Sequence, residues 1–205
     1  MGSCASVIAV PEKPKWIYVV QFRNKFYKDK ILETTDGFRQ INNNTVELKA
    51  CTKNNIEGIR WSRGFTTGRH VIEFIYPVHV RTRWSRVGLG TRETSLGGKT
   101  KDVIGGQGSF AIDLVSNKAY HNNRAVSKLP GIKPLPDWFF MYVDLDEGVI
   151  QFGSDSAFYG TAFQNVTVTD GQLFPMATAC VTGAVIGIVY RGEGKEVQGP
   201  LRKKR

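Results

Sequence analysis

The sequence has no long apolar run and few cysteines. None of its apolar stretches approaches the roughly 18 consecutive residues that a transmembrane helix needs. The stretch from Val7 to Val10 is too short for a secretory signal and follows no basic segment. The three cysteines, Cys4, Cys51 and Cys180, are an odd number without the spacing of a metal site. We therefore expect free thiols, a reducing compartment and a cytoplasmic protein.

Sequence patterns of common catalytic and metal sites are also missing. The three histidines form no His-x-x-x-His pair, and the chain has no Gly-x-Ser-x-Gly motif and no paired-cysteine motif. The Gly-rich segment 93–108 lacks the Walker arrangement of a nucleotide site. Asp144, Asp146 and Glu147 fit a cation or acid–base site, but one polar hairpin turn explains all three together. We predict a protein that is not an enzyme, with no catalytic residue, no metal and no cofactor.

What the chain does contain is a series of short apolar stretches separated by turn residues. Between 138 and 155 an apolar run leads into an acidic turn closed by Gly148, and a second apolar run follows. Such a pattern predicts a β-hairpin that needs a second sheet to cover it. Three consecutive asparagines, Asn42 to Asn44, predict a turn or a strand edge. Further strands are predicted at Trp16–Phe22, Thr45–Cys51 and Arg69–Tyr76.

Several motifs, taken in their order along the chain, are similar to those of a known domain family. The hairpin reads DLDEG, then VIQFGSD and AFYGTAF; upstream lie VGLGT at 87–91 and SFAIDLVSNKAY at 109–120. From about Asn42 to Tyr190 the series resembles the SPRY domain, in the version carried by SPRY domain–SOCS box proteins. The resemblance implies an all-β fold: a sandwich of two antiparallel sheets with a binding face built from loops. We expect a flexible arm at 1–15, the SPRY domain at 16–191 and a basic flexible tail at 192–205.

The loop from Pro77 to Arg86 is the first candidate for a binding site. It is basic and carries Trp84, and Arg and Trp are the residues enriched at interface hot spots. The alternative is that Trp84 packs on its own sandwich while the arginines are solvated. In the family, three places hold a short acidic-aliphatic-Asn-Asn-Asn peptide. The resemblance carries them over to Arg81, Thr82, Arg83 and Trp84, to Lys99 and Thr100, and to Cys180, Val181 and Thr182.

Two substitutions argue against the family's own peptide. Lys99 stands where the family has Tyr, and Val181 stands where it has Trp. Neither residue supplies the apolar surface and hydrogen-bonding edge of those aromatic side chains. We therefore expect a different protein or peptide ligand, one with more acidic character.

The predicted function is a non-catalytic adaptor that binds a protein or peptide. The family continues past the sandwich into a helical box that recruits a ubiquitin ligase, and Arg191–Arg205 is too short for that box. A substrate-recognition subunit of a ubiquitin ligase is therefore the first alternative. The net charge of +10 makes a basic nucleic-acid-binding protein the second, although no known nucleic-acid module is present.

The N-terminal sequence MGSCAS predicts a lipid anchor. It matches the pattern for N-myristoylation at Gly2, and Cys4 is placed for palmitoylation. One myristoyl chain binds membranes only marginally, so a second lipid or a basic segment such as 201–205 is needed for stable anchoring. The alternative is that these small residues are an ordinary chain start. With such an anchor, an anionic membrane surface is a further expected partner, and the cytoplasmic protein would be tethered to it through its acylated N-terminus.

Overall fold

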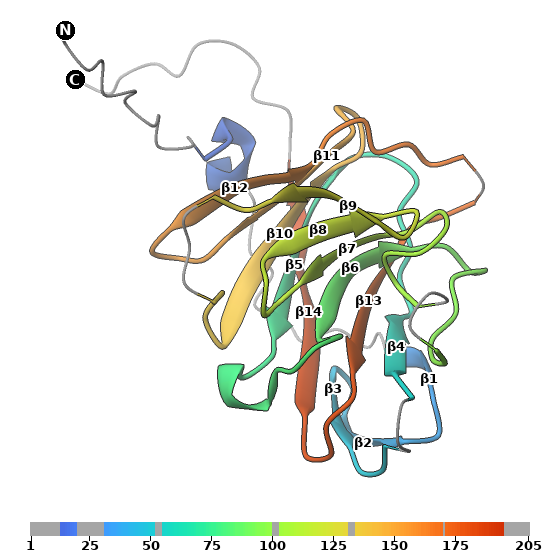
Figure 1. Ribbon diagram of the computed structural model, residues 1–205. Helices are drawn as coiled ribbons and strands as arrows, with labels where there is room; N and C mark the ends of the chain where they lie inside the picture. The colour runs from blue at the N-terminus through green and yellow to red at the C-terminus, as the bar shows by residue number, and fades with distance from the viewer. Residues whose placement is uncertain are drawn as a thin grey trace, which may run out of the picture.

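Two seven-stranded antiparallel sheets lie face to face (Figure 1). The computed structural model describes residues 13–19, 31–51, 55–99, 103–130, 134–169 and 171–194. The first sheet has the order β1-β4-β13-β6-β7-β8-β9, with bounds β1 Ile31–Thr34, β4 Glu57–Trp61, β13 Phe174–Ala179, β6 Arg86–Gly90, β7 Phe110–Asp113, β8 Lys118–His121 and β9 Arg124–Lys128. The second has the order β12-β11-β10-β5-β14-β3-β2, with bounds β12 Phe158–Phe163, β11 Val149–Gly153, β10 Trp138–Asp144, β5 Arg69–Ile75, β14 Val185–Gly194, β3 Thr45–Leu48 and β2 Phe38–Asn42. The expected all-β sandwich is confirmed.

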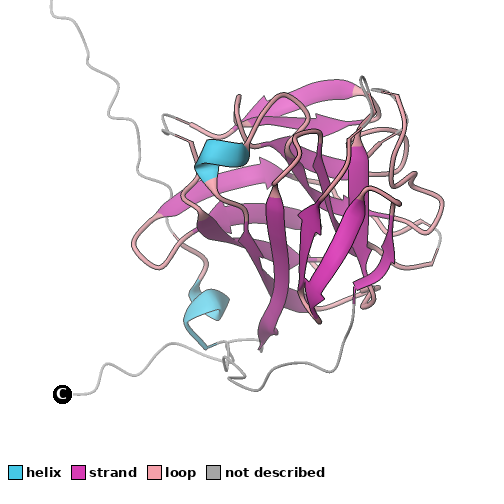
Figure 2. Cartoon of the chain, turned by 90° about the horizontal axis from the view of Figure 1, so that it is seen from below, coloured by secondary structure: helices cyan, strands magenta, loops and turns pink. Residues whose placement is uncertain are grey.

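Alternation along the strands builds the core between the sheets. In β10, Phe139 and Met141 are buried within the main core, whereas Phe140 belongs to a separate cluster that includes Trp16. Aromatic rings meet across neighbouring strands, as in the stacked pair of Phe74 and Phe139 with centroids 5.9 Å apart. The two short 3-10 helices, η1 (Lys15–Val19) and η2 (Val78–Val80), lie outside the layers of strands (Figure 2). No helix in the described ranges is long and apolar enough to cross a membrane.

The predicted hairpin is confirmed as β10 and β11, and its acidic turn has structural partners. Asp144 pairs with Val149 across the hairpin, and Gly148 has a φ of 65°, which glycine adopts without steric cost. The Asp144 carboxylate accepts a hydrogen bond from Arg69 Nε at 2.7 Å, and Asp146 Oδ1 accepts one from the Gly68 backbone N–H at 2.8 Å. These carboxylates therefore hold the hairpin against the start of β5.

The predicted turn at Asn42–Asn44 is confirmed, and the strand after it is shorter than expected. Asn42 Oδ1 accepts a hydrogen bond from the Asn44 N–H at 2.9 Å, which closes the turn between β2 and β3. Val46 and Leu48 are buried, but Ala50 is exposed and β3 ends at Leu48.

The predicted strand at Trp16–Phe22 is wrong over its described part. Residues 15–19 form η1, which begins with a hydrogen bond from the Ile17 N–H to the Pro14 carbonyl oxygen at 3.1 Å. Trp16 and Ile17 are buried on the outer surface of the second sheet, where Trp16 packs edge-on against Tyr142. Trp16 and Ile17 therefore cover a sheet instead of extending one, so apolar composition alone does not distinguish a buried 3-10 helix from a strand here.

Candidate protein-interaction surface

The loop before β6 and the turn after β13 meet at one end of the sandwich. β6 and β13 are antiparallel neighbours, and their register pairs Arg86 with Thr178. The start of β6 therefore lies beside the end of β13. We call the surface formed by residues 81–86 and 180–184 the loop face. β14 begins at this face and runs to the opposite end of the molecule (Figure 1).

Trp84 is held in an unusual backbone conformation on the loop face. Its φ is 79°, in a region that costs a bulky residue about 1–3 kcal/mol. Two contacts from the end of β13 fix the conformation. Thr178 Oγ1 donates a hydrogen bond to the Trp84 carbonyl oxygen at 2.7 Å, and Cys180 Sγ donates one to the Arg83 carbonyl oxygen at 2.9 Å. The Cys180 thiol also lies 3.0 Å from Thr82 Oγ1.

Arg86 lies between two aromatic rings. Its guanidinium carbon is 4.3 Å from the ring centroid of Trp84 and 4.3 Å from that of Tyr120. Only 5% of the residue is exposed, and burial lowers the pKa of its guanidinium, while Asp113 opposes that shift. Nη1 donates to the Ile104 carbonyl oxygen at 3.0 Å. Nε is buried and has no hydrogen-bond partner among the described residues.

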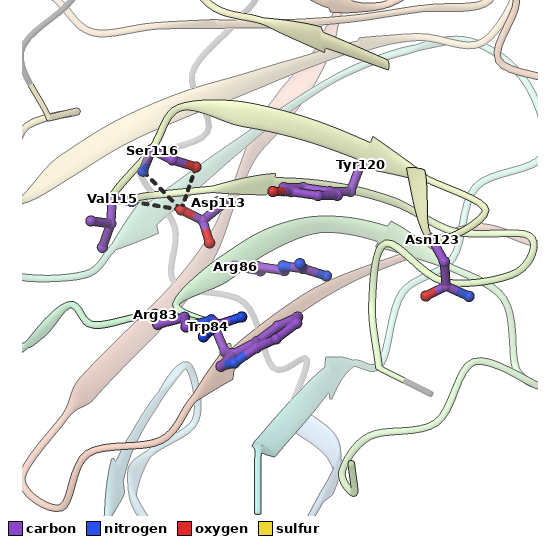
Figure 3. Close-up of a pocket in the computed structure, with 8 residues that line it drawn as sticks. All are labelled: Arg83, Trp84, Arg86, Asp113, Val115, Ser116, Tyr120 and Asn123. Carbon is purple, nitrogen blue, oxygen red and sulfur yellow. Dashed lines mark hydrogen bonds between the residues drawn. The ribbon is translucent and has the colours of Figure 1, made fainter. Parts of the chain in front are cut away.

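A cavity of about 530 Å³ opens beside this stack. Figure 3 shows the guanidinium of Arg86 between the two rings, with Asp113 on the neighbouring strand. Asp113 Oδ1 accepts hydrogen bonds from the Val115 and Ser116 N–H groups at 3.2 and 2.8 Å, so one carboxylate oxygen is committed to the β7–β8 turn. The lining combines apolar and charged groups and consists of Arg83, Trp84, Arg86, Asp113, Val115, Ser116, Tyr120 and Asn123.

Arg81 lies inside the loop and does not present its guanidinium on the surface, contrary to the prediction. Nε donates to the Tyr76 carbonyl oxygen at 2.8 Å, Nη1 donates to the Leu135 carbonyl oxygen, and Nη2 donates to those of Tyr76 and Pro136. Burial lowers the pKa of Arg81 to about 10. Its role is to tie the loop to the segment before β10.

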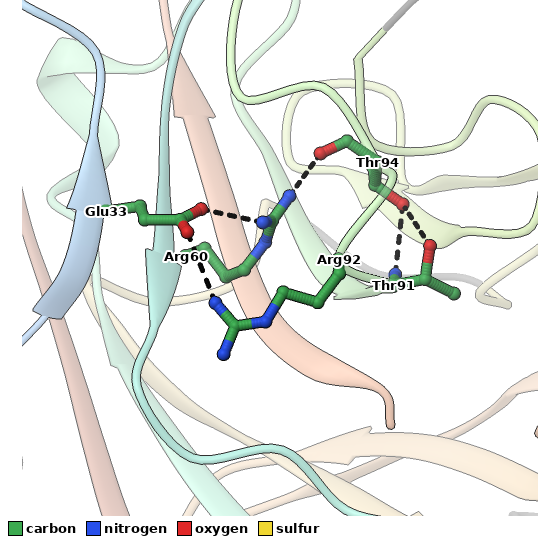
Figure 4. Close-up of polar contacts among 5 residues, drawn as sticks. All are labelled: Glu33, Arg60, Thr91, Arg92 and Thr94. Carbon is green, nitrogen blue, oxygen red and sulfur yellow. Dashed lines mark hydrogen bonds and ion pairs between the residues drawn. The ribbon is translucent and has the colours of Figure 1, made fainter. Parts of the chain in front are cut away.

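Lys99 lies at the same end of the sandwich, but the segment that carries it is attached beside β4. The chain after β6 is fastened to the first sheet, where Glu33 pairs with Arg60 at 2.6 Å and with Arg92 at 3.2 Å (Figure 4). Gly98 then exchanges two hydrogen bonds of 3.0 Å with Ile56, directly before β4. Because β13 separates β4 from β6, the exposed Lys99 lies at the edge of the loop face, away from Trp84.

The structure thus brings most of the predicted site residues together. Thr82, Arg83, Trp84 and Cys180 are in direct contact, and half-buried Val181 and exposed Thr182 follow Cys180 in the β13–β14 turn. Thr100, Gly2 and Cys4 lie outside the described residues.

Asp113 and Tyr120 were missed by sequence reasoning. They come from the segment 109–120, which carries one of the family motifs, and lie on β7 and β8. Only the register of three strands, which pairs Arg86 with Asp113 and Ala111 with Tyr120, brings them to Arg86.

Comparisons with known proteins agree with the fold. The Drosophila melanogaster protein gustavus is 29% identical over 144 residues, 65% of this chain and 51% of gustavus. Human SPRY domain-containing SOCS box protein 1 is 29% identical over 133 residues, 60% of this chain and 48% of the relative. The crystal structure of the SPRY domain of human HERC1 matches with a TM-score of 0.60 over 78% of this chain and 96% of that one, at 14% identity.

The chain spans about half the length of these curated relatives. The sequence pattern of the SPRY domain matches residues 73–193, which is more than half of the chain. The match begins inside β5 and runs through the last described strand, so it includes the whole loop face. The chain therefore belongs to the SPRY domain family.

Proposed function

We propose that this protein is a non-catalytic adaptor that binds a protein or peptide through the loop face. SPRY domains are protein-interaction modules, and the proposal assigns the interaction to one surface. The observation that carries it is Trp84, which is fixed at a positive φ beside an open cavity. Strained, over-determined residues cluster at functional sites, and a preorganised Trp binds with little loss of side-chain entropy.

The loop face favours a partner with acidic residues. Arg83 is exposed beside Trp84, its guanidinium carbon 5.4 Å from the ring centroid, and Lys99 is exposed at the edge of the same face. Val181, which stands where the family's peptide-binding Trp is expected, is half-buried and packs against the core. Specificity in this protein then depends on Trp84 and the basic residues around it.

The test is affinity capture from cells of the full chain and of its Trp84→Ala variant, followed by quantitative mass spectrometry. Trp138→Ala is the matched control, because Trp138 is a 43% exposed tryptophan at the start of β10 in the second sheet and is not one of the residues that form the loop face. We expect a set of proteins lost from Trp84→Ala and retained by Trp138→Ala. Identical captures from all three proteins would contradict the assignment of the loop face.

Two alternatives give different results in the same experiment. If the protein is the substrate-recognition subunit of a ubiquitin ligase, as the name of the SOCS box relatives suggests, ligase subunits should be captured by all three proteins. If it binds nucleic acid, recovery should fall steeply with salt concentration and disappear after nuclease treatment.

We also propose that the molecule is tethered to an anionic membrane with the loop face pointing away. The two ends of the described domain meet: a Cβ on Gly194 would lie 2.4 Å from the Trp16 ring. β14 separates this point from the loop face by its full length. Acyl chains at Gly2 and Cys4 and the basic residues 202–205 would then act from one side of the molecule, which satisfies the two-signal requirement for stable anchoring.

Co-sedimentation with vesicles tests the tether. We expect the N-myristoylated chain to bind vesicles that contain phosphatidylserine, and a Gly2→Ala variant or neutral vesicles to reduce binding about tenfold or more. Equal sedimentation of acylated and Gly2→Ala protein would contradict the tether and leave the loop-face proposal untouched.

A further inference from the structure

We propose that the cavity between Trp84 and Tyr120 receives one carboxylate of the partner, an Asp or Glu side chain, which pairs with the guanidinium of Arg86. This inference rests on the proposed function and names the chemical group that the loop face selects. It concerns a part of the cavity wall built by β6, β7 and β8, outside the three segments that the family resemblance assigned.

The guanidinium of Arg86 has a donor without a partner among the described residues. A buried guanidinium has five N–H donors, and each one left without a partner costs free energy. Here Nη1 bonds to Ile104, whereas Nε has no partner in the described part of the chain. Asp113 stands directly opposite in the strand pairing, but the two form no ion pair within 4.0 Å in the described ranges. The cavity wall therefore contains a buried guanidinium whose nearest carboxylate, Asp113, acts on it electrostatically without forming an ion pair.

The cavity also has a suitable geometry for a carboxylate. The ring centroids of Trp84 and Tyr120 each lie 4.3 Å from the guanidinium carbon of Arg86, and Arg86 is one of the residues that line the cavity. A carboxylate is planar and pairs with guanidinium edge to edge, and the surrounding rings exclude water and strengthen the pair. The backbone of Trp84 is fixed by the hydrogen bond from Thr178 to its carbonyl group.

The surface around the cavity carries an excess of positive charge. Arg83 is exposed at one side of the lining. On the same sheet, exposed Lys118 of β8 stands directly opposite exposed Lys128 of β9, and like charges in that position repel. Asp113 is the one acidic residue in the lining. Within the lining, Arg83 and Arg86 against Asp113 leave one positive charge, which one carboxylate balances.

A direct test uses a small probe and the intact protein. N-acetylglutamic acid N-methylamide, which has a single carboxylate, is titrated into ¹⁵N-labelled full chain, and the indole N–H signal of Trp84 is followed by NMR. The glutamine analogue is the neutral control. We expect saturable shifts of this signal at millimolar concentration with the Glu probe alone. Equal responses to the two probes, or no response to either, would overturn the inference.

A second test separates failure of the inference from failure of the proposed function. Peptides are selected from a random library against the full chain, and their affinities are measured with wild type, Trp84→Ala and Arg86→Gln. We expect peptides that require Trp84 to share an Asp or Glu, and its replacement by the amide to weaken binding about 10- to 100-fold in the wild type. The same replacement should have little effect against Arg86→Gln, which is the coupling that a direct pair produces.

Each other outcome points to one claim. Peptides that require Trp84 but carry no acidic residue would overturn the carboxylate pairing and leave the interaction surface standing. Peptides that bind Trp84→Ala as well as wild type would contradict the surface itself. Selection of phosphoserine in place of Asp or Glu from a phosphorylated library would replace the carboxylate by a phosphate. Thermal unfolding of Arg86→Gln checks its fold, and the NMR titration of the wild type does not depend on that variant.

Discussion

Arg81 and Arg86 flank the same loop and are both buried, but their guanidinium groups differ in how many hydrogen bonds they donate within the protein. Arg81 donates hydrogen bonds to the carbonyl oxygens of Tyr76, Leu135 and Pro136. Arg86 lies between Trp84 and a second ring, with its Nε unsatisfied in the described part of the chain. An arginine that donates four hydrogen bonds to backbone carbonyl oxygens stabilises a loop, whereas one with several donors left over can bind a partner.

The largest expected effect is the loss of stability in Arg81→Met. The substitution keeps much of the apolar stem but takes the guanidinium donor from the buried carbonyl oxygens of Tyr76 and Leu135 and from the half-buried one of Pro136, which should cost about 3 kcal/mol or more of unfolding free energy. For a chain of this size the unfolding midpoint should fall by roughly 6–12 °C. Differential scanning calorimetry measures the change. Arg83→Met is the control, since Arg83 is exposed, and it should change the unfolding free energy by less than about 0.5 kcal/mol. Equal midpoints in the two variants would contradict the structural role of Arg81 in the loop.

The next effect separates strain from binding at Trp84. Glycine adopts a φ of 79° freely, whereas alanine does not, so Trp84→Gly should retain about 1 kcal/mol more stability than Trp84→Ala. Urea unfolding measures this difference. Both variants remove the indole and should lose peptide binding to the same extent, by about 30-fold or more. A Gly variant less stable than the Ala variant would show that the loop changes its backbone when the indole is removed.

Thr178→Val should act on Trp84 without touching the cavity. Valine has nearly the same shape but cannot donate to the Trp84 carbonyl oxygen, so the unfolding free energy should fall by about 1 kcal/mol. Peptide affinity should fall as well, because the backbone that carries the indole is less well fixed. The control is Thr182→Val at an exposed position of the β13–β14 turn, which should leave stability nearly unchanged. Unchanged affinity in Thr178→Val would mean that preorganisation of Trp84 contributes nothing.

The same contrast explains how far the sequence could predict this protein. The hairpin at β10 and β11 follows from local patterns, and the ordered motifs identified the sandwich. Trp84 is predicted as a binding residue because its residue type and basic neighbours are typical of an interface, and the structure places it on the loop face. Arg81 was misplaced because its partners at Leu135 and Pro136 lie more than fifty positions away in the chain.

The cavity wall depends on long-range pairing in the same way. Arg86 meets Asp113 only through the register of β6 and β7, and no local pattern specifies that register. Residue type thus revealed which side chains could bind, and strand pairing decided which of them are free to do so.

The smallest expected effect tests the charge around Arg86. Lys128→Glu converts a directly opposed pair of like charges on β8 and β9 into an attractive pair with Lys118 and should stabilise the protein by a few tenths of a kcal/mol. It also removes positive potential from the sheet that carries the cavity, so an acidic peptide should bind a few-fold more weakly, mainly through a slower association rate. Surface plasmon resonance at low and high salt measures both rates. A direct contact between the carboxylate and Arg86 is short-ranged, so the dissociation rate should stay the same in Lys128→Glu and rise in Arg86→Gln. The two variants thereby separate the long-range electrostatic field of the basic sheet from the direct contact with the Arg86 guanidinium.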